Sequence, residues 1–426
     1  MRPDVAARDG AFLEAAGAIG ARLCRDAVWD GGRCNWLGDM MEPLGGAWTV
    51  VHRAMGPTLY DGTAGIALFL ARLYRLTGER PFRTAAEGAL RQAVSRAGTI
   101  DPAARIGLHS GLMGIAWALA AAGEALGEGA LLDESRRLAR ELLDVEPSPD
   151  ATDVISGSAG AVPALLELAA RHGDPELRAL AVRHGEMLLD AANRGEAGWS
   201  WRTLDMPVRQ DLTGYSHGAA GIALALLELF RATGDERFRE GAGEGFRYER
   251  GCFVPAQGNW PDFRVFGDPA AAASTPVGCS LAWCHGAPGI GLARLRAHRL
   301  TGDPVYRDEA VAAVTTTTLA LRMAAAGSAG FSLCHGDAGN AELLLHAAEA
   351  LGEPAHRAIA EEVGRRGIEW YLAPGAPWPC GVLNAGETPG LMLGLAGIGY
   401  FYLRLHDPAA VPSVLLLTPP DPGGGE

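Results

Sequence analysis

The sequence predicts an all-α fold, an α/α toroid of seven inner and seven outer helices. Two observations carry this prediction. A Gly-x-x-Gly motif opens an apolar run seven times along the 426-residue chain, with first glycines at 62, 111, 157, 218, 286, 336 and 394. A Gly-Asp or Gly-Glu pair follows six of these motifs, each time 13 residues after the later glycine. A spacing that is kept six times indicates that one supersecondary unit is repeated.

Each repeat predicts an apolar helix followed by an amphipathic one. The runs Ile66–Leu76 and Ile222–Ala232 are apolar around most of a helical circumference, as expected of a helix buried on nearly all sides. The glycine of the Gly-acid pair fits a left-handed position just beyond the helix end. The more charged, amphipathic segments are residues 8–26, 81–97, 131–144, 175–193, 236–247, 304–325 and 354–372.

Helical pairs of this period either stack as an open solenoid or close into a ring. A ring is favoured here, because the apolar helices are too hydrophobic to line a solvent-facing concave surface. We expect one toroid domain over residues 1–417. The tail from Thr418, TPPDPGGGE, is expected to be disordered.

Composition excludes several functions. A net charge of −13 argues against nonspecific binding to nucleic acid or to anionic membranes. All 37 basic residues are arginines, so a Walker-A lysine and a Schiff-base lysine are both ruled out. Residues 106–123 are long enough for a marginal membrane span, but the repeat register assigns them to a buried helix. Seven cysteines form no even disulfide framework, and the N-terminus has no signal-peptide core, so we expect a soluble cytoplasmic protein without membrane insertion.

Two cysteines share one repeat position. Cys284 and Cys334 are each followed by a histidine, His285 and His335. In a closed toroid the N-terminal ends of the inner helices meet at one mouth, so Cys284, Cys334 and His335 can converge. Two thiolates and an imidazole suit Zn²⁺, and three protein ligands leave a fourth position open, as in catalytic zinc sites. His285 is a rival ligand, and small core-filling cysteines are the structural alternative.

His217 occupies the position of His285 one repeat earlier, where it could exchange protons near neutral pH. Asp153 lies four residues before Gly157, so it is either a helix-capping residue or the carboxylate that orients the histidine. Asp61 and His109 fall near the same end of their helices, and we interpret both as structural.

The two longest connectors precede the fourth and fifth apolar helices. They contain Trp199, Trp201 and the run from Trp260 to Arg264. Long loops at one face of a scaffold often carry substrate contacts, so these aromatic residues are candidate contacts for a peptide or another extended ligand.

The motifs SHGAAGI, WCHGAPGI, LCHGDAGN and ETPGLMLGLAGIGYFYLRL resemble those of the lanthionine synthetase cyclases, the LanC-like family. The resemblance extends over about residues 10–415 and is greatest to the C-terminal cyclase domain of bifunctional class II lanthipeptide synthetases. It implies an α/α toroid with one zinc ion held by Cys284, Cys334 and His335. It also implies that His217 is the acid/base residue and Asp153 its supporting carboxylate.

The resemblance implies a zinc-dependent cyclase. Such an enzyme adds cysteine thiols to dehydroalanine or dehydrobutyrine within a precursor peptide, which forms (methyl)lanthionine thioether rings. The repeats occupy nearly the whole sequence and leave no N-terminal dehydratase or kinase portion, so we expect a separate dehydratase or kinase/lyase enzyme to supply the dehydrated peptide. The alternatives are addition of glutathione to dehydroamino acids and a non-catalytic scaffold that binds leader peptides. A glycosidase would need a carboxylate pair, and Asp61, Asp153 and Asp337 share no repeat position.

Overall fold

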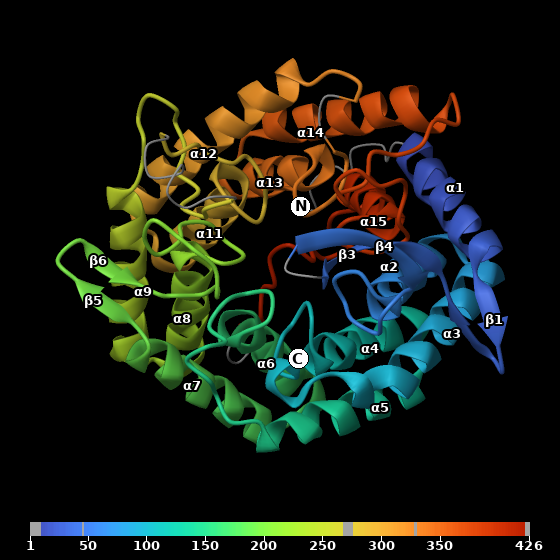
Figure 1. Cartoon of the computed structure of the whole chain (residues 1–426), viewed down its shortest axis with the longest axis horizontal. Helices are drawn as coiled ribbons and strands as arrows, with labels where there is room; N and C mark the ends of the chain where they lie inside the picture. Colours follow the sequence, from blue (N-terminus) through green and yellow to red (C-terminus); the bar gives the residue numbers. More distant parts are fainter. Residues whose placement is uncertain (1–9, 45–46, 267–275, 328–329, 422–426) are drawn as a thin grey trace, which may run out of the picture. The chain divides into compact units, whose positions relative to one another are not determined.

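The computed structural model describes residues 10–44, 47–266, 276–327 and 330–421. Over these residues the chain forms fourteen α-helices, in which apolar and amphipathic helices alternate as predicted (Figure 1). The apolar helices are α2 (Thr63–Thr77), α4 (Leu112–Leu126), α6 (Ser158–His172), α8 (Ala219–Thr233), α11 (Ala287–Thr301), α13 (Asp337–Ala350) and α15 (Leu395–His406). The amphipathic helices are α1 (Gly10–Asp26), α3 (Arg80–Arg96), α5 (Gly129–Arg140), α7 (Pro175–Asp190), α9 (Glu236–Gly251), α12 (Pro304–Met323) and α14 (Pro354–Gly367).

The helices group into two compact units. The first comprises Met1–Ala97, Ala121–Leu131 and Ala324–Leu415, and the second Gly98–Ala120, Leu132–Met323 and Leu416–Glu426. Within the first, α2 packs on α3, α13 on α14, and α15 on both α1 and α2. Within the second, α6 packs on α7, α8 on α9 and α11 on α12, while α8 also contacts α6 and α11. An apolar helix therefore packs both on its amphipathic partner and on the next apolar helix.

The repeated glycines are explained by close backbone approach. At the second glycine of six of the seven motifs, the carbonyl six residues earlier lies against the first helical turn. A Cβ atom would stand 2.2 Å from the Leu59 oxygen at Gly65, and 2.0 Å from the Val154 oxygen at Gly160. Real Cβ atoms essentially never approach another atom so closely, so these positions require glycine.

The glycines at the helix ends serve a different purpose. Gly78, Gly173 and Gly234 follow α2, α6 and α8 with φ angles of 72°, 61° and 73°. This left-handed conformation is costly for residues with a Cβ atom, and it confirms the predicted position beyond the helix end.

Three β-hairpins were not predicted. They pair β1 (Val28–Asp30) with β2 (Arg33–Asn35), β3 (Leu37–Leu44) with β4 (Ala47–Ala54), and β5 (Asn193–Gly195) with β6 (Gly198–Ser200). The first two lie between α1 and α2, ahead of the first Gly-x-x-Gly motif, so the repeat register says nothing about them. The run Asp30-Gly31-Gly32 is nevertheless a typical hairpin turn, and both glycines have positive φ.

Several buried charges on the apolar helices are paired. On α11, Arg294 donates to Glu249 at 2.9 Å, and Arg296 donates to Glu228 at 2.6 Å. On α15, Arg404 donates to Glu342 at 3.1 Å. A planar guanidinium keeps its charge and bonds two acceptors at once, which suits a buried pair better than an ammonium group.

The C-terminal tail is described as far as residue 421. Arg231 of α8 donates from Nη2 to the Pro419 carbonyl at 2.7 Å and from Nη1 to the Pro420 carbonyl at 3.0 Å. The prediction of disorder for residues 422–426 lies outside the described residues.

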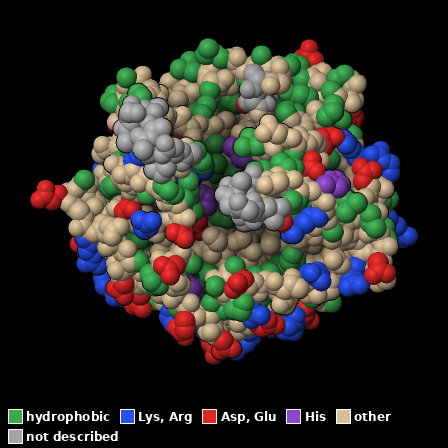
Figure 2. Space-filling view, in the orientation of Figure 1, with side chains coloured by type: hydrophobic (Ala, Val, Ile, Leu, Met, Phe, Trp, Pro, Cys, Tyr) green, Lys and Arg blue, Asp and Glu red, His purple; other side chains and the backbone are tan. Residues whose placement is uncertain are grey.

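Two surface properties bear on function. Within the part of the chain that the structure describes, no helix has both the length and the apolar character needed to cross a bilayer. On the face drawn in Figure 2, acidic and arginine side chains are interspersed, and the described residues there form no broad basic patch.

The close contact between the second glycine and a carbonyl predicts that one added methyl group lowers the stability of the protein. We expect Gly65→Ala to destabilise the protein by about 1–3 kcal/mol, because the new Cβ must displace the Leu59 carbonyl. Gly17→Ala in α1 is the matched control, since no atom lies within 4 Å of its added Cβ. It should be neutral or slightly stabilising. Denaturant unfolding of both variants tests this, and equal stabilities would contradict the packing argument.

Candidate functional site

The loops that precede the apolar helices are joined by backbone hydrogen bonds at one repeat position. In each bond, an amide located five residues before the second glycine donates to the carbonyl at the same position of another repeat. Because the bonded residues are equivalent, the register that aligned Cys284 with Cys334 is confirmed. The pairs are His109 N to Ile155 O (2.9 Å), Ser216 N to Cys284 O (3.2 Å), Cys334 N to Met392 O (2.9 Å) and Met392 N to Tyr60 O (2.7 Å).

Within the first unit, His335 is oriented by a carbonyl. Its Nε2 lies 2.8 Å from the Gly381 oxygen. Since a carbonyl only accepts, the proton must be on Nε2, and Nδ1 presents its lone pair as a metal ligand. The Gly381 amide is itself held by the Leu393 carbonyl at 2.7 Å. A Cβ at Gly381 would stand 2.8 Å from the histidine Nε2, so a side chain here would have to displace His335 or its neighbours.

Cys284, Cys334 and His335 form a group that could hold a metal ion. Their candidate ligand atoms lie within 4.8 Å of one another. Two thiols and one imidazole fit zinc, and the set leaves one tetrahedral position for a water or substrate. The orientation of His335 by Gly381 is the kind of support that metal-ligating histidines usually have. His285, the rival ligand, is not part of this group.

Within the second unit, His217 and Asp153 form a hydrogen-bonded pair. The distance from His217 Nδ1 to Asp153 Oδ2 is 2.5 Å, and Asp153 is buried. The other carboxylate oxygen accepts from the Ser156 amide at 2.8 Å and from its hydroxyl at 3.1 Å. A neutral His217 therefore carries its proton on Nδ1 and has a basic Nε2.

The loop of His217 is fixed to the loop of Cys284. The amide and the hydroxyl of Ser216 both lie 3.2 Å from the Cys284 carbonyl. Gly214 makes this approach possible, because it has a φ of 109° and a Cβ there would stand 3.0 Å from the same carbonyl. The Gly214 amide donates in turn to Glu249 at 2.8 Å, which links the loop to the buried pair with Arg294.

Two further histidines surround this loop. His285 is buried, neither ring nitrogen has a hydrogen-bond partner among the described residues, and its ring centroid lies 5.7 Å from that of His217. Burial lowers the pKa of His285 to about 4 and has the same effect on His109, which packs edge-on against Trp283. Both side chains are therefore neutral at physiological pH, and His109 agrees with the structural role assigned to it.

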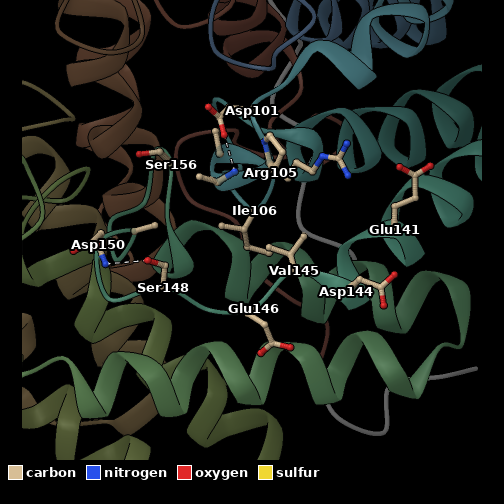
Figure 3. Close-up of a pocket in the computed structure, with 14 residues that line it drawn as sticks. Asp101, Arg105, Ile106, Glu141, Asp144, Val145, Glu146, Ser148, Asp150 and Ser156 are labelled. Carbon is tan, nitrogen blue, oxygen red and sulfur yellow. Dashed lines mark hydrogen bonds between the residues drawn. The ribbon is translucent and has the colours of Figure 1, made fainter.

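A cavity of about 940 Å³ adjoins the Asp153 loop (Figure 3). Ser156, which donates to Asp153, is one of its lining residues. Five carboxylates and one arginine contribute to the lining, together with Ile106 and Val145. The charged residues are Asp101, Arg105, Glu141, Asp144, Glu146 and Asp150.

The connector aromatics do not all face solvent. Trp201 and Trp260 are buried, and the Trp201 indole donates to the Leu188 carbonyl at 2.8 Å. The interpretation of these two residues as substrate contacts is therefore wrong, because they anchor their loops to the core. Sequence reasoning also missed Ser156 and Gly381. Register could have identified Ser156, which occupies the position of His217, but Gly381 lies in a loop without a repeat signature.

Comparison with known proteins identifies the family and the fold class. The model of the lanthionine synthetase C-like protein family matches residues 53–416. The structure of a nisin cyclase superimposes with a TM-score of 0.64 at 17% identity, covering 95% of this chain and 96% of that chain. This match confirms the α/α toroid fold class. A sugar epimerase from a ruminal bacterium has a TM-score of 0.49 at 15% identity and covers 72% of this chain and 89% of that chain.

The Asp153 contact predicts the tautomer of His217. In the zinc-free protein we expect the neutral ring to carry its proton on Nδ1, because a carboxylate can only accept there. Asp153→Asn should weaken this preference, since an amide can donate to Nδ1 as well as accept from it. Nitrogen-15 NMR of labelled histidine measures the tautomer. A predominant Nε2–H form in the unsubstituted protein would contradict the assignment.

Proposed function

The chain belongs to the lanthionine synthetase C-like family, and from this we propose that it is a zinc-dependent lanthipeptide cyclase. The reaction is the intramolecular addition of cysteine thiols to dehydroalanine or dehydrobutyrine residues of a precursor peptide. The bond formed joins sulfur to Cβ, and the resulting enolate takes up a proton at Cα. No atom is lost, because the thiol proton is balanced by the proton added to carbon.

The observation that carries this proposal is the group of Cys284, Cys334 and His335, whose ligand atoms lie within 4.8 Å of one another. These residues would hold the zinc ion, His335 through Nδ1. When bound, zinc supplies a Lewis acid that lowers the pKa of a thiol at the open position. A scaffold protein would have no use for such a ligand set.

His217 is the proposed acid and base. With Nδ1 engaged by Asp153, its Nε2 can accept the proton of the substrate thiol. The buried carboxylate then stabilises the imidazolium and holds its ring in place. The same Nε2 can return a proton to Cα after the thioether bond has formed. Because the Ser216 amide bonds to the Cys284 carbonyl, the base and one zinc ligand lie on adjoining loops.

The cavity beside Asp153 supports a peptide rather than a small thiol as substrate. Its volume of about 940 Å³ accommodates several residues, and Ser156 connects its lining to the His217–Asp153 pair. Holding both reacting residues of one peptide lowers the entropic barrier to ring closure. A separate dehydratase or kinase/lyase enzyme would supply the dehydrated peptide.

Substitutions separate metal binding from proton transfer. Cys284→Ala and Cys334→Ala should each lose zinc and cyclisation together, because two protein ligands hold zinc poorly. His217→Ala should keep one zinc per chain and slow ring closure about 10²- to 10⁴-fold. Elemental analysis measures zinc, and mass spectrometry of thiol-alkylated peptide counts the rings formed. Cys24→Ala, in α1, is the control and should change neither.

The outcomes also separate the alternatives. Full zinc content in Cys334→Ala would overturn the ligand assignment. Turnover of a dehydrated peptide with glutathione, but without internal rings, would favour thiol addition. Binding of a leader peptide by a protein that holds no zinc after reconstitution would favour the scaffold.

A further inference from the structure

A second cavity, of about 290 Å³, lies within the first unit beside the backbone that orients His335. It is bounded by the β3 strand, by Tyr60 and Asp61, and by the loop of residues 382–393. Val382 and Leu393 line it. Val382 follows Gly381 in the chain, and the Leu393 carbonyl accepts from the Gly381 amide. The Gly381 carbonyl in turn holds the histidine in place. We propose that this cavity receives a lysine or arginine side chain of the peptide substrate. The inference rests on the proposed function in that the ligand is a peptide.

The charge of the lining supports a cationic occupant. Asp39 and Asp61 both line the cavity, and no arginine or histidine is among its lining residues in the described part of the chain. Asp39 accepts from His52 Nδ1 at 2.7 Å and from the Gly386 amide at 3.1 Å. The hydrogen bond from His52 lowers the pKa of Asp39, so this carboxylate stays ionised.

Asp61 has acceptor capacity to spare. One of its oxygens, Oδ1, accepts from the Thr58 hydroxyl at 2.8 Å. Among the described residues its other oxygen has no hydrogen-bond or ion-pair partner. Gly390 lies directly against the Asp61 backbone, where a Cβ would stand 2.9 Å from its Cα atom. The absence of a side chain at 390 keeps this end of the cavity open.

An unpartnered hydroxyl gives independent support for a ligand. Thr388 lines the cavity and is 2% exposed, yet its Oγ1 has no hydrogen-bond partner in the described structure. A buried hydroxyl without a partner is costly, and a bound molecule that donates a hydrogen bond to it would remove that cost. An ammonium or guanidinium group carries only donors, so it can bond this oxygen and the carboxylates together.

The apolar part of the lining fits the stem of such a side chain. Met40, Met41, Tyr60, Val382 and Leu393 contribute to it. Lysine and arginine bury their methylene chains along apolar surfaces while their charged ends reach polar groups. The volume suits one side chain rather than a longer segment. The cavity therefore distinguishes substrates by a single residue near the reacting cysteine.

The test uses binding, so that it does not depend on ring formation. The probes are fluorescein-labelled decapeptides of alanine, glycine and serine with one cysteine and no dehydrated residue. Each flanking position in turn carries lysine, norleucine or glutamate. With zinc-reconstituted protein, we expect lysine at one position to bind about tenfold more tightly than norleucine, and glutamate to bind more weakly than both. Asp61→Asn should remove the preference for lysine over norleucine.

Two further variants make the result specific. Thr388→Val keeps both carboxylates and should reduce the lysine preference several-fold. Glu42→Gln is the matched control, because Glu42 lies on the same hairpin, pairs with Arg53 at 2.5 Å and does not line the cavity. It should retain the full preference. Zinc content and thermal unfolding of each variant verify that it is folded.

The inference is overturned if lysine and norleucine bind equally at every position, or if Asp61→Asn keeps the preference. Tighter binding of norleucine would identify an apolar pocket instead. A lysine preference that depends on Asp61, in a protein that forms no rings, would refute the cyclase function and leave this site standing. Ring formation by a protein that shows no lysine preference would refute this site and leave the cyclase function standing.

Discussion

The close contact between a carbonyl and the first turn of six apolar helices determines most of the other features. Because the second glycine has no Cβ, the preceding loop can turn back onto its own helix, as at Gly160 and Gly339, where the nearest carbonyl oxygen would lie 2.0 Å and 1.7 Å from an added Cβ. The residue that follows this carbonyl is thereby placed where its amide or its carbonyl forms a hydrogen bond with the loop of another repeat. Cys284 and Cys334 both occupy that bonded position. Their location therefore follows from backbone geometry and requires no special folding of either loop.

This arrangement explains why much of the fold was predictable. Glycine best satisfies both the contact at the helix start and the left-handed turn at the helix end, so its spacing marks six of the seven repeats. The register then aligned the two cysteines and the histidine that follows each of them, which was sufficient to predict a thiolate–imidazole site from Cys284, Cys334 and His335. The alternating helices required no further information.

Features outside the repeat escaped prediction for physical reasons. The β3–β4 hairpin lies before the first motif, and its strands show no strict alternation of polar and apolar residues. Gly381 orients His335 through its carbonyl, and a backbone acceptor leaves no trace in residue type. Trp201 and Trp260 were misassigned because an aromatic residue in a long connector looks the same in sequence whether it anchors the loop or faces a ligand. Burial decides between these roles, and burial depends on contacts far away in the chain.

The polar groups around His217 explain how an acid/base residue is kept ready on a loop. A loop has few internal constraints, so each part of this one is restrained from outside: Asp153 holds the ring, Thr203 donates to the His217 carbonyl at 2.5 Å, and Glu249 holds the Gly214 amide. Glu249 is itself buried with Arg294 at 0% exposure. Removing Arg294 would leave an unpaired buried carboxylate, whose pKa burial already raises. Once protonated, that carboxyl would accept more weakly from Gly214, and the loop would lose part of its support. The buried ion pairs of the apolar helices thus contribute to the position of the proposed base as well as to the core.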